Sequence, residues 1–278
     1  MTTTHAITSA FTRTVASDGA GVPVLTHTPH DPRGWLVWAH GGSWQRGSAA
    51  AWAPVTATLA ARTGWAVASV DYRLAPAHRF PMAVLDVLAV LHWAEAQAED
   101  LPVVVGGDSA GGTIAAIAAL ARRHAGAPVP GQLLAYPPLD PSCARPSYTA
   151  EPGAFPSAAD LRAAWQSWLS DGMRDPAFPP TPLQASSLAG LAPVTLVVGE
   201  NDPVRDDATA YADRLHADGV PVTRTIVAGA GHAELLHSDS GVLAALATAL
   251  TGPPLAADSQ PASPASIREP HHREGNPP

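Results

Sequence analysis

Short apolar runs alternate with longer Ala- and Leu-rich segments along most of this chain, and this alternation constrains the fold more than any other feature. It is typical of a mostly parallel sheet with helices on both faces, so we expect an α/β fold. The runs that we expect to be strands, each bounded by Gly or Pro, are Gly34 to His40, Gly64 to Asp71, Pro102 to Gly106, Gln132 to Tyr136, Pro193 to Gly199 and Pro221 to Val227.

The segments between these strands are expected to be helices. Asp202 and Pro203 fit the N-cap and the first position of one helix, and Gly219 fits its end. Near the N-terminus, Asp18-Gly19 predicts the turn of a peripheral hairpin. The expected helices are Ala51 to Arg62, Met82 to Gln97, Thr113 to His124, Ala159 to Leu169, Val204 to Ala217 and Ser240 to Leu250.

Two stretches rich in Pro and Ser, Pro137 to Pro156 and Asp175 to Pro182, interrupt the alternation and flank a helix that carries two Trp residues. They predict a lid-like insertion at about residues 141–182, lying over the sheet. Hydrophobic content of 46% over 278 residues is enough for one large core. We therefore expect one catalytic domain over residues 1–252 and a disordered tail at 253–278, where the composition cannot bury enough apolar surface.

Composition excludes several classes of function. The net charge is −8 and only 14% of residues are charged, so no broad basic surface is available to attract nucleic acid or anionic lipid. All 16 basic residues are Arg. Because the chain has no Lys, it can be neither a Schiff-base enzyme nor a P-loop nucleotide-binding protein. Cys143 is the single cysteine and is expected to be a buried structural residue. We find neither a signal peptide nor a membrane span, and therefore expect a cytoplasmic protein.

The hexapeptide Gly107 to Gly112 (GDSAGG) contains G-x-S-x-G between the apolar run PVVVG and an expected helix. A nucleophile elbow needs small residues on both sides, because the chain turns sharply there and holds the serine in a strained, exposed conformation. A phosphate cradle is disfavoured because the chain has no Lys and lacks the G-x-G-x-x-G spacing. We therefore expect Ser109 to be a nucleophile.

A serine hydroxyl needs a base within hydrogen-bond reach, and the base needs a carboxylate to orient it. With such an elbow the expected chain order is serine, acid, histidine. Asp202 follows the strand PVTLVVG at the edge where ligands gather, and His232 ends the Gly-rich turn after the last expected strand. The alternatives left open are Glu200 and Asp206 for the acid and His237 for the base.

Acyl transfer also develops an oxyanion, which fixed N–H donors must stabilise. The loop HGGSW follows the strand GWLVWAH and has the position of an oxyanion loop. The backbone N–H groups of Gly41, Gly42 and Ser43, together with that of Ala110, are the expected donors.

Four blocks together resemble the hormone-sensitive-lipase-like esterases, the bacterial family IV of the α/β-hydrolase fold. They are His40 to Trp44, then Asp71 to Pro81 (DYRLAPAHRFP) with Asp86, then GDSAGG, and last Asp202 to Asp206 with His232. The resemblance implies an eight-stranded sheet and a serine carboxylesterase that acts on short- to medium-chain acyl esters through an acyl-enzyme on Ser109. It implies a small-molecule ester as substrate and no cofactor. The histidines outside the triad show no metal-ligand spacing with acidic partners, so we expect no metal. An exposed helix edge near Ser240 to Leu250 could pair two copies into a homodimer, as in similar esterases, and the oligomeric state is left open.

This sequence departs from the family pattern at three places. Ser43 replaces a glycine of the oxyanion loop, the segment before that loop is short for N-terminal cap helices, and Ala233 follows His232 where the family usually has a nearby aromatic residue. The HGGxW loop is also similar to that of arylformamidases, so hydrolysis of an N-formyl amide is the alternative reaction. A non-catalytic binding protein of this fold, similar to the plant gibberellin receptors, is disfavoured because all three triad positions are filled.

Overall fold

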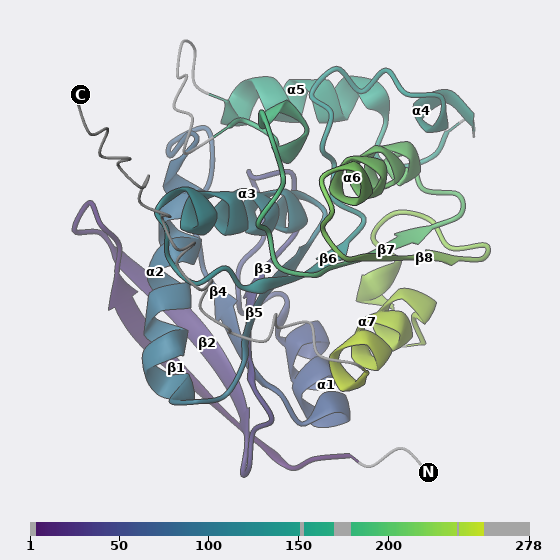
Figure 1. The fold of residues 1–278 in the computed structure, drawn as a ribbon. Helices are drawn as coiled ribbons and strands as arrows, with labels where there is room; N and C mark the ends of the chain where they lie inside the picture. The colour runs from purple at the N-terminus through teal and green to yellow at the C-terminus, as the bar shows by residue number, and fades with distance from the viewer. Residues whose placement is uncertain (1–3, 151–152, 170–178, 238, 253–278) are drawn as a thin grey trace, which may run out of the picture.

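The computed structural model describes residues 4–150, 153–169, 179–237 and 239–252, so the expected tail at 253–278 lies outside the described residues. Eight strands, the number that the sequence resemblance implies, form one sheet in the order β1-β2-β4-β3-β5-β6-β7-β8 (Figure 1). The strands are β1 (Ile7–Val15), β2 (Gly21–Pro29), β3 (Trp35–Ala39), β4 (Ala66–Val70), β5 (Val103–Asp108), β6 (Gly131–Ala135), β7 (Val194–Gly199) and β8 (Val222–Val227).

The first two strands form the expected hairpin, with Gly19 at φ +84° in its turn. β2 pairs antiparallel with β4, and every later pair in the sheet is parallel. Among the described residues ahead of β3 there is no helix, which agrees with the expected loss of N-terminal cap helices. The sheet is buried at its centre, where all five residues of β3 and of β4 are inaccessible or nearly so.

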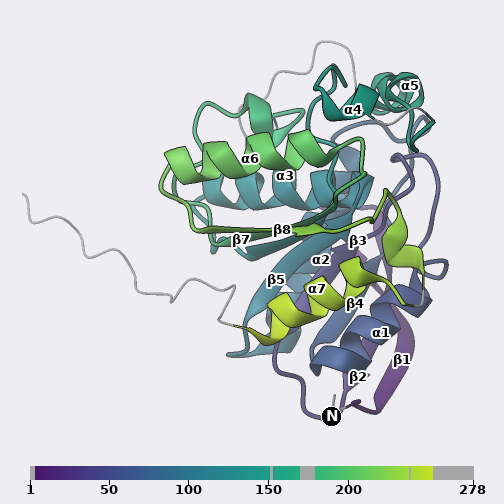
Figure 2. The same cartoon turned by 90° about the vertical axis from the view of Figure 1, so that its right-hand side faces the viewer.

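Helices cover both faces of the sheet. α2 packs beside α3 on the face that also carries α6, while α1 packs beside α7 on the other face (Figure 2). α4 and α5, from the insertion, lie outside the layer formed by α3 and α6 (Figures 1 and 2). The helices are α1 (Ala53–Thr63), α2 (Met82–Ala98), α3 (Ala110–His124), α4 (Ser147–Ala150), α5 (Ala158–Trp168), α6 (Arg205–Ala217) and α7 (Gly241–Thr251), with short 3₁₀ turns η1 (Pro182–Gln184) and η2 (Glu234–Leu236).

Five of the six expected helix starts shift by one to three residues, and the site explains two of these shifts. α3 begins at Ala110, before the expected Thr113, because the elbow feeds directly into the helix and its glycines form the first turn. A Cβ at Gly111 would lie 2.0 Å from the Ala39 carbonyl oxygen, so close packing on β3 demands glycine there. α6 begins at Arg205, with Pro203 outside it, because Asp202 accepts the Val204 N–H and caps a turn that precedes the helix.

No helix in the described part of the chain has both the length and the apolar character needed to cross a bilayer.

Candidate active site

The chemistry-bearing segments predicted from the sequence all follow strands at one edge of the sheet. The oxyanion loop follows β3, the elbow follows β5, and the acid and histidine segments follow β7 and β8. These four strands are parallel, so their carboxyl ends meet at the same edge. Topology alone therefore brings side chains that are more than a hundred positions apart in sequence into one place.

Ser109 stands at the turn between β5 and α3 in a conformation that L-residues seldom adopt. Its φ is +50° and its ψ is −123°, and its N–H donates to the Ala135 carbonyl on the neighbouring strand at 2.9 Å. Such a backbone costs on the order of 1–3 kcal/mol and persists only where the surroundings fix it. The result is a serine presented at the edge of the sheet, as the G-x-S-x-G pattern predicts.

The three predicted triad side chains form one continuous series of contacts. Ser109 Oγ lies 2.9 Å from His232 Nε2, and His232 Nδ1 lies 3.0 Å from each carboxylate oxygen of Asp202. The side chain of His232 is 4% exposed and that of Asp202 is fully buried, so water screens this pair very little.

The alternative acids and base have other partners. Glu200 accepts the Gly229 N–H at 2.9 Å, and Asp206 accepts the Ser147 N–H at 2.9 Å. His237 is exposed, and its backbone N–H donates to the Glu234 carbonyl. Among the described residues, the Ser109 hydroxyl forms its hydrogen bond with His232 and with none of these three.

The oxyanion loop requires one correction to the expected donors. The Gly41 N–H donates to Asp108 Oδ1 at 3.1 Å, so this donor is already occupied by a buried carboxyl group. In the described part of the chain, the N–H groups of Gly42, Ser43 and Ala110 donate to no protein acceptor. These three are therefore the groups that remain for a developing oxyanion.

Sequence reasoning missed the part played by Asp108, the residue before the serine. Its Oδ1 accepts from the indoles of Trp38 at 3.2 Å and Trp52 at 2.8 Å, besides the Gly41 N–H. Burial raises the pKa of Asp108 to about 7, against the lowering effect of these donors. The carboxyl thus ties together the elbow, β3, the start of α1 and the oxyanion loop.

The DYRLAP block also supports the oxyanion loop, through contacts with His40. The Tyr72 hydroxyl donates to the His40 carbonyl at 2.8 Å, and the two rings stack with centroids 4.2 Å apart. Burial lowers the pKa of His40, which favours its neutral form. Arg73 pairs with the buried carboxylate of Asp86 at 2.7 Å, which fixes the block on α2.

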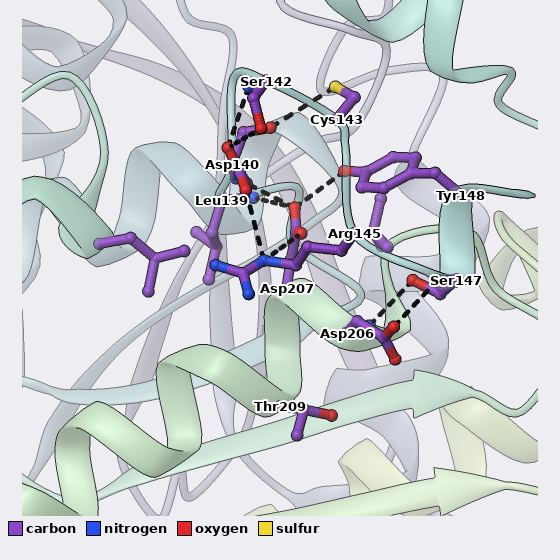
Figure 3. Close-up of polar contacts among 12 residues, drawn as sticks. Leu139, Asp140, Ser142, Cys143, Arg145, Ser147, Tyr148, Asp206, Asp207 and Thr209 are labelled. Carbon is purple, nitrogen blue, oxygen red and sulfur yellow. Dashed lines mark hydrogen bonds and ion pairs between the residues drawn. The ribbon is translucent and has the colours of Figure 1, made fainter.

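The turn that carries Asp202 is held by α4 as well. The Ser147 hydroxyl donates to the Pro203 carbonyl at 2.6 Å. The Asp206 N–H donates back to the same hydroxyl oxygen at 3.2 Å (Figure 3). Together with the Ser147 N–H bond to the Asp206 carboxylate, these contacts connect the insertion to the residue next to the acid.

Asp207 forms the buried centre of this region (Figure 3). It accepts from the N–H groups of Leu139 at 2.8 Å and Asp140 at 3.0 Å and from the Tyr148 hydroxyl at 2.8 Å. Burial raises the pKa of Asp207 to about 6. Nearby, burial raises the pKa of Cys143 to about 11, as expected for a structural thiol rather than a nucleophile.

Comparisons with known proteins agree on one family. The model of the α/β-hydrolase fold family matches residues 36–236. Carboxylesterase NlhH of Mycobacterium tuberculosis is 38% identical over 76% of this chain and 70% of its own length, and ethyl acetate hydrolase of Pseudomonas putida is 35% identical over 77% and 72%.

Solved structures agree as well. A bacterial heroin esterase superposes with a TM-score of 0.78 at 32% identity, covering 88% of this chain and 84% of that protein. Esterase LipW of Mycobacterium marinum gives the same TM-score at 30% identity, with 88% and 81% covered. The resemblance to esterases read from the sequence blocks is thereby confirmed.

Proposed function

This chain belongs to the α/β-hydrolase fold family and is a carboxylic ester hydrolase, and we propose that Ser109, His232 and Asp202 are its catalytic triad. The observation that carries the proposal is the unbroken series from the serine oxygen to the imidazole, at 2.9 Å, and on to the carboxylate, at 3.0 Å. A base within this distance can accept the hydroxyl proton as the oxygen attacks an ester carbonyl.

The first half of the reaction forms an acyl-enzyme. His232 takes the Ser109 proton, the serine oxygen adds to the ester carbonyl, and the carbonyl oxygen becomes an oxyanion near the N–H groups of Gly42, Ser43 and Ala110. His232 then protonates the leaving alcohol. Asp202 stays ionised, holding Nδ1 protonated so that Nε2 can act as the base.

The second half returns the free enzyme. Water takes the place of the alcohol, His232 accepts a proton from it, and the resulting hydroxide attacks the acyl carbonyl. The tetrahedral intermediate collapses with the proton returning to Ser109, and the carboxylic acid leaves. These steps require no redox change and no group beyond those named.

We propose short- to medium-chain acyl esters as the substrate class. The support is the family resemblance and the activities of similar proteins, which include an ethyl acetate hydrolase. A series of p-nitrophenyl esters from acetate to decanoate, run beside N-formylkynurenine, measures the chain-length preference and the formamide alternative together. Faster hydrolysis of the formamide than of every ester would contradict this assignment.

The triad proposal is tested at the serine. Ser109→Ala should abolish turnover of p-nitrophenyl butyrate while circular dichroism and the unfolding temperature stay close to those of the wild type. A fluorophosphonate probe should label Ser109 in the wild type, with the adduct located by peptide mass spectrometry. Retained turnover in Ser109→Ala, or a wild-type protein that the probe does not label, would refute the assignment.

We propose that residues 1–252 act as one catalytic unit, that two copies form a homodimer, and that the protein works in the cytoplasm. Light scattering after size-exclusion chromatography tests the dimer, and fractionation of the source cells tests the location. A monomeric mass at tens of micromolar protein would refute the dimer.

A further inference from the structure

A stack of tryptophans joins the insertion to the oxyanion loop. Trp44, the residue after Ser43, lies 4.3 Å from Trp165 and 4.6 Å from Trp168 between ring centroids, and the rings of Trp44 and Trp168 are nearly parallel at 5°. All three side chains are at most 1% exposed. Trp165 and Trp168 belong to α5, so a helix of the insertion packs directly on the loop beside the proposed oxyanion donors.

Backbone bonds fix the same contact at two points. The Ala75 N–H donates to the Trp44 carbonyl at 2.9 Å, and the Phe80 N–H donates to the Trp168 carbonyl at 2.8 Å. The Phe80 ring also meets Trp168 edge-on, with centroids 5.2 Å apart. The segment around the DYRLAP block therefore holds both Trp44 and the end of α5.

The backbone beneath the stack is strained. Ser43 has φ +55° and Trp44 has φ +60°, two successive residues with side chains in the left-handed region. Residues with side chains are strained in this region, and they persist only when the surrounding structure over-determines them. Gly42 before them has φ +117°, where a Cβ would lie 2.1 Å from the Arg46 carbonyl oxygen. The loop that carries the proposed donors thus needs an outside support.

The three tryptophans contribute packing of their rings rather than hydrogen bonds. Within the described chain, the indole N–H groups of Trp44, Trp165 and Trp168 have no hydrogen-bond partner, although all three are buried. A buried donor without a partner is destabilising. What these side chains give the protein is therefore the packing of large flat rings against Trp44.

We propose that Trp165 and Trp168 are positioning residues for ester hydrolysis, holding Trp44 so that the Ser43 and Gly42 N–H groups keep the geometry that binds the oxyanion. This inference rests on the proposed function, because it assigns a support to the proposed oxyanion loop. The insertion then acts through α5 as a brace on the reaction centre.

The first experiment separates positioning from substrate binding. Trp168→Ala and Trp165→Ala should lower kcat for p-nitrophenyl butyrate about 10- to 100-fold, approaching the loss of one oxyanion donor, with KM changed less than about threefold. Trp168→Phe keeps a flat ring and removes the unpartnered N–H, so its kcat should stay within about threefold of the wild type.

Trp93→Ala is the matched control. Trp93 on α2 packs edge-on against Trp35 at 5.4 Å, so the variant removes one ring of a Trp pair that lies outside the stack. It should leave kcat unchanged. An equal loss in this variant would mean that loss of packing anywhere in the core lowers activity, and the proposal would fall.

A second experiment tests the strain directly. Glycine adopts positive φ readily, so Ser43→Gly should restore kcat of Trp168→Ala at least about threefold by lowering the cost of the competent loop. If the Ala variants lose cooperative unfolding, Trp168→Leu and Trp165→Leu take their place. Absence of rescue, or wild-type kcat in both single variants, overturns the inference, while fluorophosphonate labelling of wild-type Ser109 shows separately whether the proposed function holds.

Discussion

One carboxylate oxygen of Asp202 serves two neighbours, which makes this residue a sharp test. Oδ1 accepts the Val204 N–H at 2.9 Å and lies 3.0 Å from His232 Nδ1. Asn at this position keeps an oxygen for the Val204 N–H but loses the negative charge, and its NH2 group, which can only donate, replaces the second oxygen beside His232 Nδ1. We expect Asp202→Asn to lower kcat on the order of 10⁴-fold with a nearly unchanged unfolding temperature, because the imidazole loses its orientation and its ionic partner.

Steady-state kinetics of Asp202→Asn beside Glu200→Gln checks this expectation. Glu200 accepts the exposed Gly229 N–H and serves as the control among nearby acids. If Glu200→Gln lost as much activity as Asp202→Asn, the acid would have been assigned to the wrong residue.

At the level of single residues, motif and chain order were enough to predict Ser109, Asp202 and His232 as one group. Asp108 shows what they could not predict. Its indole partners come from positions 70 and 56 residues away, and no local pattern indicates which donors the fold brings to a carboxyl group. The same limit applies to Gly41, whose N–H looked available in the sequence and is occupied in the structure.

Secondary structure elements were predicted well where periodicity and flanking residues agreed, and less well where the site overrides them. The beginning of α3 was missed because Gly111 and Gly112 disfavour helix in isolation, while the elbow requires a helix at once. The insertion was predicted as a lid from its Pro and Ser content. Its buried anchors, Trp165 and Trp168, could not be assigned a partner until the fold placed Trp44 beneath them.

Phe155, in the loop before α5, is expected to contact the substrate. Phe155 is 61% exposed, and its ring lies edge-on to that of His232 with centroids 6.0 Å apart. Ala233, the residue after His232, has no aromatic side chain. An aromatic side chain there offers an apolar wall to a substrate that reaches the serine. We expect Phe155→Ala to raise KM for p-nitrophenyl butyrate about three- to tenfold, with kcat less affected, because apolar contact with the bound ester is lost.

Phe11→Ala is the control for this measurement. Phe11 on β1 is 68% exposed, so it matches Phe155 in size and exposure but lies on the outer hairpin. A larger rise in KM for longer acyl chains in Phe155→Ala, absent from Phe11→Ala, supports the wall. Equal kinetics in the two variants would remove Phe155 from the substrate site.

For the whole molecule, the order of strands and helices was predictable because a parallel sheet buried on both faces leaves a strong apolar signal in the sequence. The resemblance implied the number of strands but not their order, since β4 inserts between β2 and β3 and no local pattern dictates that exchange. Burial of ionisable groups is likewise a property of the whole fold. Asp108 and Asp207 were unremarkable in the sequence, yet both carboxyls lie inside the molecule.

This burial predicts how stability depends on pH. Because folding raises the pKa of Asp108 from 3.8 to about 7, the folded chain binds one more proton than the unfolded chain between these values. The free energy of unfolding contributed by this group is therefore fully present below about pH 4 and is lost as pH rises toward 7, at about 1.4 kcal/mol per pH unit. Buried His27 and His40, whose pKa values are lowered, contribute the opposite slope below pH 6.5.

A substitution isolates the share of Asp108 from these opposing groups. Asp108→Asn keeps an oxygen that can accept the Trp52 and Trp38 indoles and removes the titration. Relative to the wild type, its free energy of unfolding should rise by about 2–3 kcal/mol between pH 5 and pH 8, as measured by urea unfolding at both values. Asp31→Asn, at a side chain that is 93% exposed, should show no such rise. If the free energy of unfolding changed with pH equally in Asp108→Asn and the wild type, the buried carboxyl would remain ionised throughout. Its three hydrogen-bond donors would then hold it in that form.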